Sequence, residues 1–387
     1  MLTAIEIPGI GICSGPSPWR LKIGHMTSTV AAPLTTHDST RIDDTRIGAV
    51  RPLITPALLE EKLPVPQAAQ SLVESSRAAI SRVLHGVDDR LIVVVGPCSI
   101  HDHAQAMEYA RQLKVQADAL KDDLLVVMRV YFEKPRTTVG WKGYINDPHL
   151  DGSFAINQGL EMARKLMLEI LELGLPVATE FLDLLSPQFI SELVSWGAIG
   201  ARTTESQSHR QLASGLSCPV GFKNGTDGGL KVASDAIQAA QASHAFMGMT
   251  KMGQVAIFET RGNHDCHVIL RGGKQTNYAK ADVDAACALL KGAGLREQVM
   301  VDVSHANSSK QHQRQIVVAE DVAAQIAAGD KRITGIMIES HLEEGRQDIT
   351  PGVPLKHGVS VTDACISMAQ TVPVLEQLAA AVRTRRV

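Results

Sequence analysis

The 387-residue sequence contains no long apolar run and few aromatic residues. Phe, Trp and Tyr together make up 4% of it, while 44% is hydrophobic and 20% charged, as in a soluble globular enzyme of one large or two smaller domains. No apolar stretch reaches the roughly 20 residues that a membrane-spanning helix needs. The first residues also lack the basic start of a signal peptide. We therefore expect a cytoplasmic protein with no membrane partner.

The sequence also lacks a large excess of either charge, and its cysteines are not regularly spaced. The formal net charge is −3, and like charges form no run outside the last few residues, which argues against a nucleic-acid partner. The six cysteines form no C-x-x-C pair. This spacing indicates neither a disulfide framework nor a structural zinc knuckle, and it suits a reducing compartment.

Residues 1–42 are rich in Gly, Pro, Ser and Thr and show little periodicity. Such a composition predicts a loosely ordered N-terminal arm, followed by a single catalytic domain over residues 43–387. Met26 is a second candidate for the start of translation.

From residue 71 onward, short β-rich runs alternate with helical patterns of 10–20 residues. This alternation predicts repeated βα units on a parallel sheet. Eight units are found, with strands expected at 91–95, 124–130, 176–180, 198–202, 219–223, 266–271, 299–303 and 335–339. The expected fold is α/β, a (β/α)₈ TIM barrel with an N-terminal extension and an inserted β-hairpin. A doubly wound open sheet is the rival, but no G-x-G-x-x-G opens the first helix.

A polar residue lies at the exit of each predicted strand. Active sites of such barrels form at the carboxyl ends of the strands, so these residues should converge. Cations that converge in an acidic protein indicate an anionic ligand, with phosphate or carboxylate groups. Glycines in 223–229 and 271–274 would let backbone amides approach the same anion. The strand exits are Cys98, Arg129, Glu180, Arg202, Lys223, Arg271, His305 and Glu339.

Three of these exits, Cys98, His305 and Glu339, could share a metal ion with Asp363. This mixed S, N and O donor set suits a divalent transition metal such as Mn, Fe, Co or Zn. Each residue alone has a plainer interpretation, since cysteines are usually buried and inert and Asp363 could cap a helix. His101 and His103 form an H-x-H that could also bind metal, although the favoured interpretation is that Asp102 and both histidines cap the helix that follows.

Eight motifs follow one another along the chain: GPCSIHD, RVYFEKPRTTVGWKG, GARTTESQ, GFKNGTDG, HVILRGGK, DVSHANSSKQ, ESHLEEG and TDAC. In these motifs the chain, from about residue 43 to the C-terminus, resembles type I 3-deoxy-D-arabino-heptulosonate-7-phosphate (DAHP) synthase, the metal-dependent microbial class. It implies condensation of phosphoenolpyruvate with erythrose 4-phosphate, the entry step of the shikimate route to aromatic amino acids. The predicted activity is therefore 3-deoxy-7-phosphoheptulonate synthase.

The resemblance also assigns roles to the site residues. It implies metal ligation by Cys98, His305, Glu339 and Asp363. Arg202, Lys223 and Arg271 would hold the phosphate of phosphoenolpyruvate, and Arg129 with Lys134 its carboxylate. Arg136 and Thr137 would grip the phosphate of the second substrate. Proton transfer is left open among the metal, Lys134, Glu180 and His305.

Family members carry an effector pocket outside the barrel for an aromatic amino acid. The matching positions here are Asp43, Asp44, Pro187, Gln188, Leu216, Ser217, Phe246, Gly248 and Phe258. Gly248 and Phe258 depart from the Ser and Val of a phenylalanine-sensitive form, so tyrosine or tryptophan is favoured over phenylalanine. A homodimer or homotetramer is expected, because arm residues such as Asp43 need an ordered partner surface.

Two alternatives stay open. One is the related 3-deoxy-D-manno-octulosonate-8-phosphate synthase, which uses arabinose 5-phosphate; it resembles KANRSS where this chain has KPRTT. The other is a catalytically retired barrel that only binds an effector or partner.

Overall fold

The computed structural model describes residues 42–136, 138–350 and 352–387. The chain divides into two compact units, Met1–Pro52 and Leu53–Val387. The expected boundary between residues 42 and 43 stays a prediction. The predicted arm, apart from Ile42, and the alternative start at Met26 lie outside the described residues.

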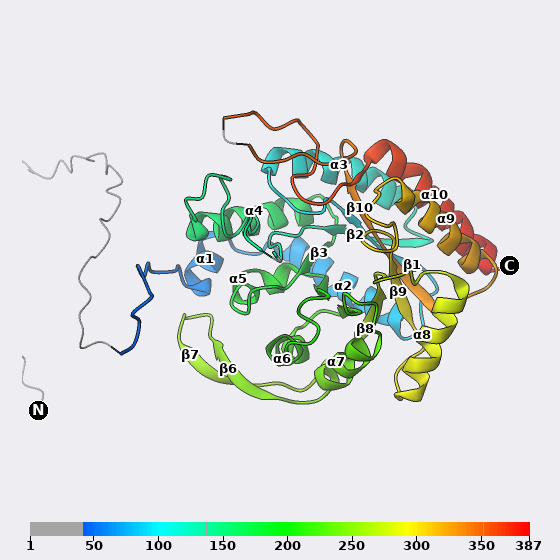
Figure 1. Cartoon of the computed structure of the whole chain (residues 1–387), viewed down its shortest axis with the longest axis horizontal. Coiled ribbons are helices and arrows are strands. Elements are labelled where there is room, and N and C mark those ends of the chain that lie inside the picture. Colours follow the sequence, from blue (N-terminus) through cyan, green and yellow to red (C-terminus); the bar gives the residue numbers. More distant parts are fainter. Residues whose placement is uncertain (1–41, 137, 351) are drawn as a thin grey trace, which may run out of the picture. The chain divides into compact units, whose positions relative to one another are not determined.

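The second unit is a closed parallel barrel, which confirms the predicted fold class (Figure 1). Neighbouring strands pair in the order β1-β2-β3-β4-β5-β8-β9-β10, and β1 pairs with β10 to close the ring. The strands are β1 (Leu91–Gly96), β2 (Leu124–Arg129), β3 (Val177–Glu180), β4 (Trp196–Ile199), β5 (Val220–Lys223), β8 (Cys266–Leu270), β9 (Val299–Asp302) and β10 (Ile333–His341). A short strand, β11 (Ile366–Ser367), pairs with the end of β10.

Helices follow the strands and lie around the barrel (Figure 1). Asp102 caps α3 by accepting a hydrogen bond from the amide of Gln105, so the capping interpretation holds for this residue. The helices are α1 (Pro56–Lys62), α2 (Gln67–Leu84), α3 (His103–Ala119), α4 (Ile156–Glu172), α5 (Pro187–Ile190), the 3₁₀ turn η1 (Ser191–Leu193), α6 (Gln207–Gly215), α7 (Lys231–Gln241), α8 (Lys280–Gly292), α9 (Arg314–Ala327) and α10 (Met368–Arg385).

Each strand contributes to two apolar layers, because successive side chains point to opposite faces. On β1, Leu91, Val93 and Val95 pack under the helices, while Ile92 and Val94 fill the barrel interior. The interior cluster also holds Tyr131, Trp196 and Met337. This apolar filling closes the barrel beneath the polar strand ends.

The inserted hairpin is present, but it begins earlier than QVAIFETRGNHDCHVIL (254–270), the segment in which the sequence suggested it. β6 (Ala245–Met249) pairs antiparallel with β7 (Val255–Glu259), and the apolar run that follows is barrel strand β8. Within the described ranges, no helix combines the length and apolarity needed to cross a membrane.

Candidate active site

A cavity of about 340 Å³ opens at the carboxyl ends of the strands. All predicted strand exits except Cys98 line it, as do Lys134, Arg136 and Asp363. Glycine is required at the end of two strands. A Cβ at Gly96 would lie 2.7 Å from the Arg129 carbonyl oxygen, and one at Gly200 would overlap the Glu180 carboxylate. The convergence expected for a barrel is therefore present.

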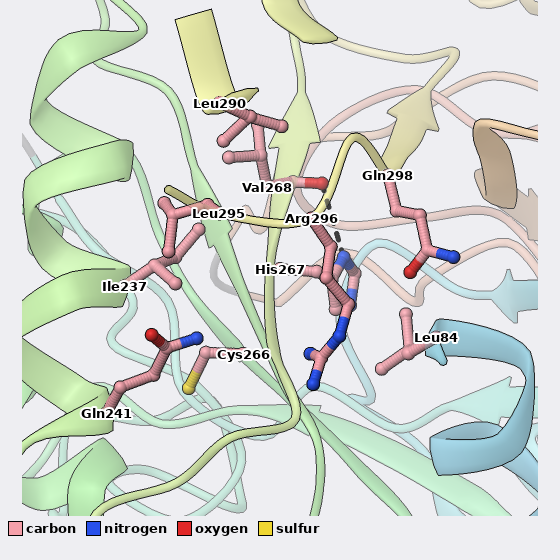
Figure 2. Close-up of a pocket in the computed structure, with 10 residues that line it drawn as sticks. All are labelled: Leu84, Ile237, Gln241, Cys266, His267, Val268, Leu290, Leu295, Arg296 and Gln298. Carbon is pink, nitrogen blue, oxygen red and sulfur yellow. Dashed lines mark hydrogen bonds between the residues drawn. The ribbon is translucent and has the colours of Figure 1, made fainter. Parts of the chain in front are cut away.

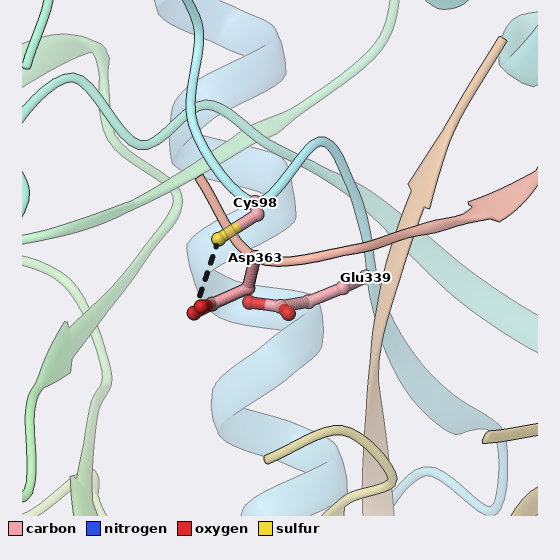
Figure 3. Close-up of side chains that lie close together, drawn as sticks. All are labelled: Cys98, Glu339 and Asp363. Atoms are coloured by element: carbon pink, nitrogen blue, oxygen red, sulfur yellow. Dashed lines mark hydrogen bonds between the residues drawn. The ribbon is translucent and has the colours of Figure 1, made fainter. Parts of the chain in front are cut away.

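Cys98, Glu339 and Asp363 form a compact group of potential metal ligands (Figure 3). One ligand atom from each lies within 4.8 Å of the others, and the Cys98 thiol is 3.6 Å from Asp363 Oδ2. Burial, together with the charge of Glu339, raises the pKa of the thiol to about 11. Metal binding here would therefore have to displace the thiol proton. The donor set, one sulfur and two carboxylates, fits a divalent transition metal.

His305 lies beside this group, but its ring nitrogens do not come within 4.8 Å of all three ligand atoms. Its Nε2 lies 3.9 Å from Glu339 Oε1, and its Nδ1 lies 3.0 Å from Asp302 Oδ2. The residue has a φ of 57°, which is uncommon for a non-glycine residue and occurs often at functional sites. The fourth predicted ligand is thus adjacent to the group, and a buried carboxylate orients its ring.

Asp302 is the site residue that the sequence analysis missed. It is fully buried, and its Oδ2 accepts a hydrogen bond from Lys223 Nζ at 2.8 Å. Although burial alone would raise its pKa, the positive Lys223 and the His305 ring hold the pKa well below the ordinary value. One ionised carboxylate therefore positions both a predicted phosphate-binding lysine and a predicted metal ligand. Its place in the apolar run VMVDV was the available signal.

Arg129 and Lys134 both lie against Cys98. Arg129 Nη2 and Lys134 Nζ each donate to the Cys98 carbonyl oxygen at 3.1 Å, and Lys134 Nζ is 3.2 Å from the sulfur. Arg129 also forms a buried ion pair with Glu339 at 2.8 Å. Burial has the largest single effect and opposes the charge on Lys134, but Cys98, Glu339 and Glu180 together outweigh it, so the pKa of Lys134 is raised. Both cations thus stay charged beside the potential metal ligands.

Arg202 and Arg271 line the same cavity from the segments that follow β4 and β8. Among the described residues, neither forms an ion pair. Burial, opposed by nearby carboxylates, lowers the pKa of Arg271, and the charge of Arg202 adds to the effect. Two neighbouring cations without a carboxylate partner in the described part of the chain favour an anionic ligand.

The loop after β2 carries Arg136, whose Nε donates to the Trp141 carbonyl oxygen at 2.8 Å. The side chain is exposed at the rim of the cavity. Thr137, predicted to share its role, lies outside the described residues.

The two glycine-rich loops have a different role from the expected one. A Cβ at Gly273 would lie 2.2 Å from the Gly228 amide nitrogen, so the two backbones pack together. The amides that the sequence assigned to an anion already donate within the protein, at Gly225, Gly228, Gly229, Gly272 and Gly273. The prediction of a backbone anion cradle was therefore wrong, and the glycines allow close loop packing instead.

With this geometry established, comparisons with known proteins identify the family. The sequence pattern described as the DAHP synthetase I family matches residues 64–376. The chain belongs to this family.

Curated relatives in the family carry names that specify different effectors. An Escherichia coli K12 protein named "Phospho-2-dehydro-3-deoxyheptonate aldolase, Phe-sensitive" is 59% identical over 89% of this chain and 98% of its own length. A tyrosine-inhibited relative from Schizosaccharomyces pombe is 54% identical over 91% of this chain and 96% of that protein. The solved structure of a phospho-2-dehydro-3-deoxyheptonate aldolase from Francisella tularensis SCHU S4 is 51% identical, has a TM-score of 0.86, and matches over 88% of this chain and 100% of that one.

A second cavity, of about 760 Å³, lies outside the barrel of this family member, between α5, α6 and the β6–β7 hairpin. Seven predicted effector residues line it: Pro187, Gln188, Leu216, Ser217, Phe246, Gly248 and Phe258. The rings of Phe246 and Phe258 stack with centroids 6.1 Å apart. A Cβ at Gly248 would lie 2.8 Å from Phe258 Cδ2, so the glycine and the large ring depend on each other. Asp43 and Asp44 belong to the other unit, where both are exposed.

The H-x-H pair does not join the metal cluster. Both ring nitrogens of His101 are buried without a hydrogen-bond partner among the described residues, and its ring lies edge-on to His341 at 5.9 Å. His103 Nε2 is 2.7 Å from Glu169 Oε2 at the start of α3. Neither side chain caps the helix, so the capping interpretation was wrong for the two histidines.

A third cavity, about 20 Å³ in volume, lies beside His267 and Cys266 (Figure 2). It has room for a single water molecule. Trp196 Nε1 donates to His267 Nε2 at 2.9 Å, so His267 Nδ1 carries the proton and donates to the Val268 carbonyl oxygen. Burial lowers the pKa of His267 to about 4. This histidine is a neutral core residue.

Proposed function

We propose that this chain condenses phosphoenolpyruvate with erythrose 4-phosphate and water to give DAHP and phosphate. The observation that carries the proposal is the arrangement at the strand ends, where cations and two carboxylates line one cavity and the buried Cys98 thiol lies against those carboxylates. Two anionic substrates and a divalent metal require these groups together. Family membership supports the same reaction.

In this proposal, Arg202, Lys223 and Arg271 bind the phosphate of phosphoenolpyruvate. Arg202 and Arg271 lack a carboxylate partner within the described ranges, and Asp302 holds Lys223 in place. Arg129 and Lys134 bind the carboxylate, because both are fixed beside Cys98. The substrate is thereby held at both ends, which leaves C3 free to react.

Arg136 and Thr137 bind the phosphate of erythrose 4-phosphate in this proposal. The exposed guanidinium of Arg136 at the cavity rim is compatible with that role. Holding both substrates by their charged ends brings C3 of phosphoenolpyruvate to the aldehyde carbon and makes the encounter effectively intramolecular.

The reaction forms a carbon–carbon bond and a carbon–oxygen bond to water, and it breaks the bond between C2 and the phosphate oxygen. C3 attacks the aldehyde carbon, whose oxygen takes up a proton. Water adds to C2 and loses one proton; the phosphate then leaves with its bridging oxygen, while the new C2 hydroxyl gives up its remaining proton and becomes the ketone. The surrounding cations offset the repulsion between the two substrates as they approach.

Lys134, Glu180 and His305 are the proposed proton carriers. The raised pKa of Lys134 keeps its ammonium charged at neutral pH, so it suits donation to the aldehyde oxygen. Glu180 is mostly buried at the end of β3 and lines the cavity. His305 lines the cavity as well, held by Asp302.

Cys98, His305, Glu339 and Asp363 are the proposed ligands of a divalent Mn, Fe, Co or Zn ion. When bound, such an ion supplies a Lewis acid that polarises the aldehyde oxygen. The mutual approach of three of these side chains and the position of His305 beside Glu339 support the assignment.

We further propose that an aromatic amino acid inhibits the enzyme from the cavity beside the hairpin, with tyrosine or tryptophan favoured over phenylalanine. The paired Gly248 and Phe258, which differ from the Ser and Val of a phenylalanine-sensitive form, support this preference. Relatives named for phenylalanine, tyrosine and tryptophan all occur in the family.

A homodimer or homotetramer is also proposed. The outer face of the hairpin presents Met247, Val255 and Ile257, which are 83%, 82% and 76% exposed. Adjacent exposed apolar side chains of this kind commonly mark protein–protein contacts. Light scattering coupled to size-exclusion chromatography gives the oligomeric state directly.

The test is phosphate release from phosphoenolpyruvate with erythrose 4-phosphate or arabinose 5-phosphate, after chelation and again after Mn²⁺ is restored. We expect release only with erythrose 4-phosphate and only with metal. Release with arabinose 5-phosphate would favour the octulosonate synthase. No release with either sugar would favour the retired barrel.

A further inference from the structure

The guanidinium of Arg129 lies flat on the ring of Tyr131. The distance from Arg129 Cζ to the ring centroid is 3.7 Å. The contact follows from the strand register, because residues two apart at the end of β2 point to the same side of the sheet. Both side chains are almost completely buried, at 1% and 0% exposure. A cation on an aromatic face gains most where water is excluded, as it is here.

Hydrogen bonds fix the edge of the guanidinium but leave its faces unconstrained. Nε donates to the Pro97 carbonyl oxygen at 3.1 Å, and Nη2 donates to Glu339 Oε1 at 2.8 Å. Nη1 lies 3.3 Å from the sulfur of Met337. These contacts lie in the guanidinium plane, so the ring of Tyr131 supplies the support perpendicular to it.

The same ring also faces a second cation. Lys134 Nζ lies 6.0 Å from its centroid. Arg129 and Lys134 repel each other, and a neutral surface that attracts both reduces the cost of holding them side by side. The Tyr131 carbonyl oxygen accepts a hydrogen bond from the Ile100 amide at 2.9 Å, which ties the backbone of Tyr131 to the loop that carries Cys98.

The hydroxyl of Tyr131 is buried and has no hydrogen-bond partner among the described residues. A buried hydroxyl without a partner destabilises a fold. The contact with the cations therefore depends on the ring, and phenylalanine should replace tyrosine without loss.

We propose that Tyr131 is a positioning residue whose ring holds Arg129 and Lys134 in the arrangement that binds the carboxylate of phosphoenolpyruvate. This inference rests on the proposed function. It adds a residue that touches neither substrate in the assignment above.

The test compares Tyr131→Leu, Tyr131→Phe and a matched control, Phe132→Leu. Phe132 is equally buried on the opposite side of the same segment, where it stacks on Tyr144 at 6.1 Å. Calorimetric titration of the Mn²⁺-loaded protein with phosphoenolpyruvate alone gives a readout independent of turnover. Steady-state assays then give the KM for each substrate and kcat.

We expect Tyr131→Leu to weaken phosphoenolpyruvate binding about 10- to 30-fold, the range for loss of a desolvated cation–π contact. The KM for erythrose 4-phosphate should stay within about twofold, since its proposed phosphate site at Arg136 does not contact the ring. Tyr131→Phe should bind like the parent. Phe132→Leu should lower the melting temperature with little change in phosphoenolpyruvate affinity.

Should Tyr131→Leu fail to fold, fluorinated phenylalanines at position 131 keep the shape of the ring while they weaken the negative potential on its face, which attracts the cation. Affinity for phosphoenolpyruvate should then fall stepwise with each added fluorine. Unchanged affinity along that series, or equal losses in Tyr131→Leu and Phe132→Leu, would overturn the proposal. So would a Tyr131→Phe variant as weak as Tyr131→Leu. Failure of the parent to bind phosphoenolpyruvate would instead remove the proposed function together with this inference.

Discussion

Glu133 is a buried carboxyl group that should make the stability of the protein depend on pH. It is 4% exposed, and its Oε2 accepts a hydrogen bond from Ser186 Oγ at 2.9 Å. Burial raises its pKa from 4.5 to about 7, against the opposing hydrogen bond from Ser186. Because the folded-state pKa exceeds the unfolded one, the protonated form favours folding. That contribution is complete below about pH 4.5 and is lost as pH rises through 7.

Glu133→Gln removes the charge while keeping the shape and the acceptor for Ser186. A pKa difference of about 2.5 corresponds to about 3 kcal/mol once both states are ionised. Between pH 5 and pH 8, the free energy of unfolding of the variant should therefore gain roughly 2–3 kcal/mol relative to the parent. This difference in the free energy of unfolding should increase with pH mainly below pH 7 and stay nearly constant above it.

Urea unfolding followed by tryptophan fluorescence measures this difference at pH 5, 6, 7 and 8. Parent and variant are compared at one protein concentration and in chelator, so that neither assembly nor metal binding differs between them. Glu172→Gln, which changes an exposed carboxyl at the end of α4, serves as the matched control. A stability difference that stays constant across this pH range would refute the argument that burial penalises the Glu133 carboxylate.

Three further predictions concern the site and the effector cavity. Cys98→Ala should lose bound metal and phosphate release together while the melting temperature stays measurable, whereas Cys287→Ala in α8 should keep both; elemental analysis beside the activity assay checks this, and full activity without metal would contradict the ligand role. Arg136→Ala should raise the KM for erythrose 4-phosphate about 10- to 100-fold, the cost of losing charged hydrogen bonds, and that for phosphoenolpyruvate far less; equal losses would contradict the assignment. Gly248→Ser should weaken inhibition by tyrosine or tryptophan because its Cβ would meet Phe258, and adding Phe258→Val should restore an inhibitor response shifted toward phenylalanine; phenylalanine as the best inhibitor of the parent would refute the preference.

The sequence predicted the barrel well where a strand is a continuous aliphatic run, and less well elsewhere. β1, LIVVVG, lies at its expected place because both of its faces are buried. β4 begins at Trp196 and ends at Ile199, earlier than the predicted 198–202, and residues 201–205 form a turn instead of continuing the strand. Helix α6 was not predicted, since its sequence QSHRQLASG buries only His209, Ala213 and Ser214.

For the site, the sequence identified the strand exits but not the pairs between them. Which carboxylate faces which cation depends on the barrel geometry, so the Lys223–Asp302 and Arg129–Glu339 pairs could not be predicted from spacing. The glycine-rich loops were misinterpreted for the same reason. Only the folded chain shows that Gly228 and Gly273 pack against each other.

These ion pairs also limit which groups can carry protons at neutral pH. Asp302 is held ionised by Lys223 and His305, and its low pKa makes it a poor proton acceptor. Lys134 is held charged by its neighbours and can donate a proton more readily than accept one. Arg129 is charged and occupied by Glu339. The proton lost by the attacking water must therefore pass to another group, and Glu180 and His305 are the cavity-lining side chains that remain among the proposed carriers.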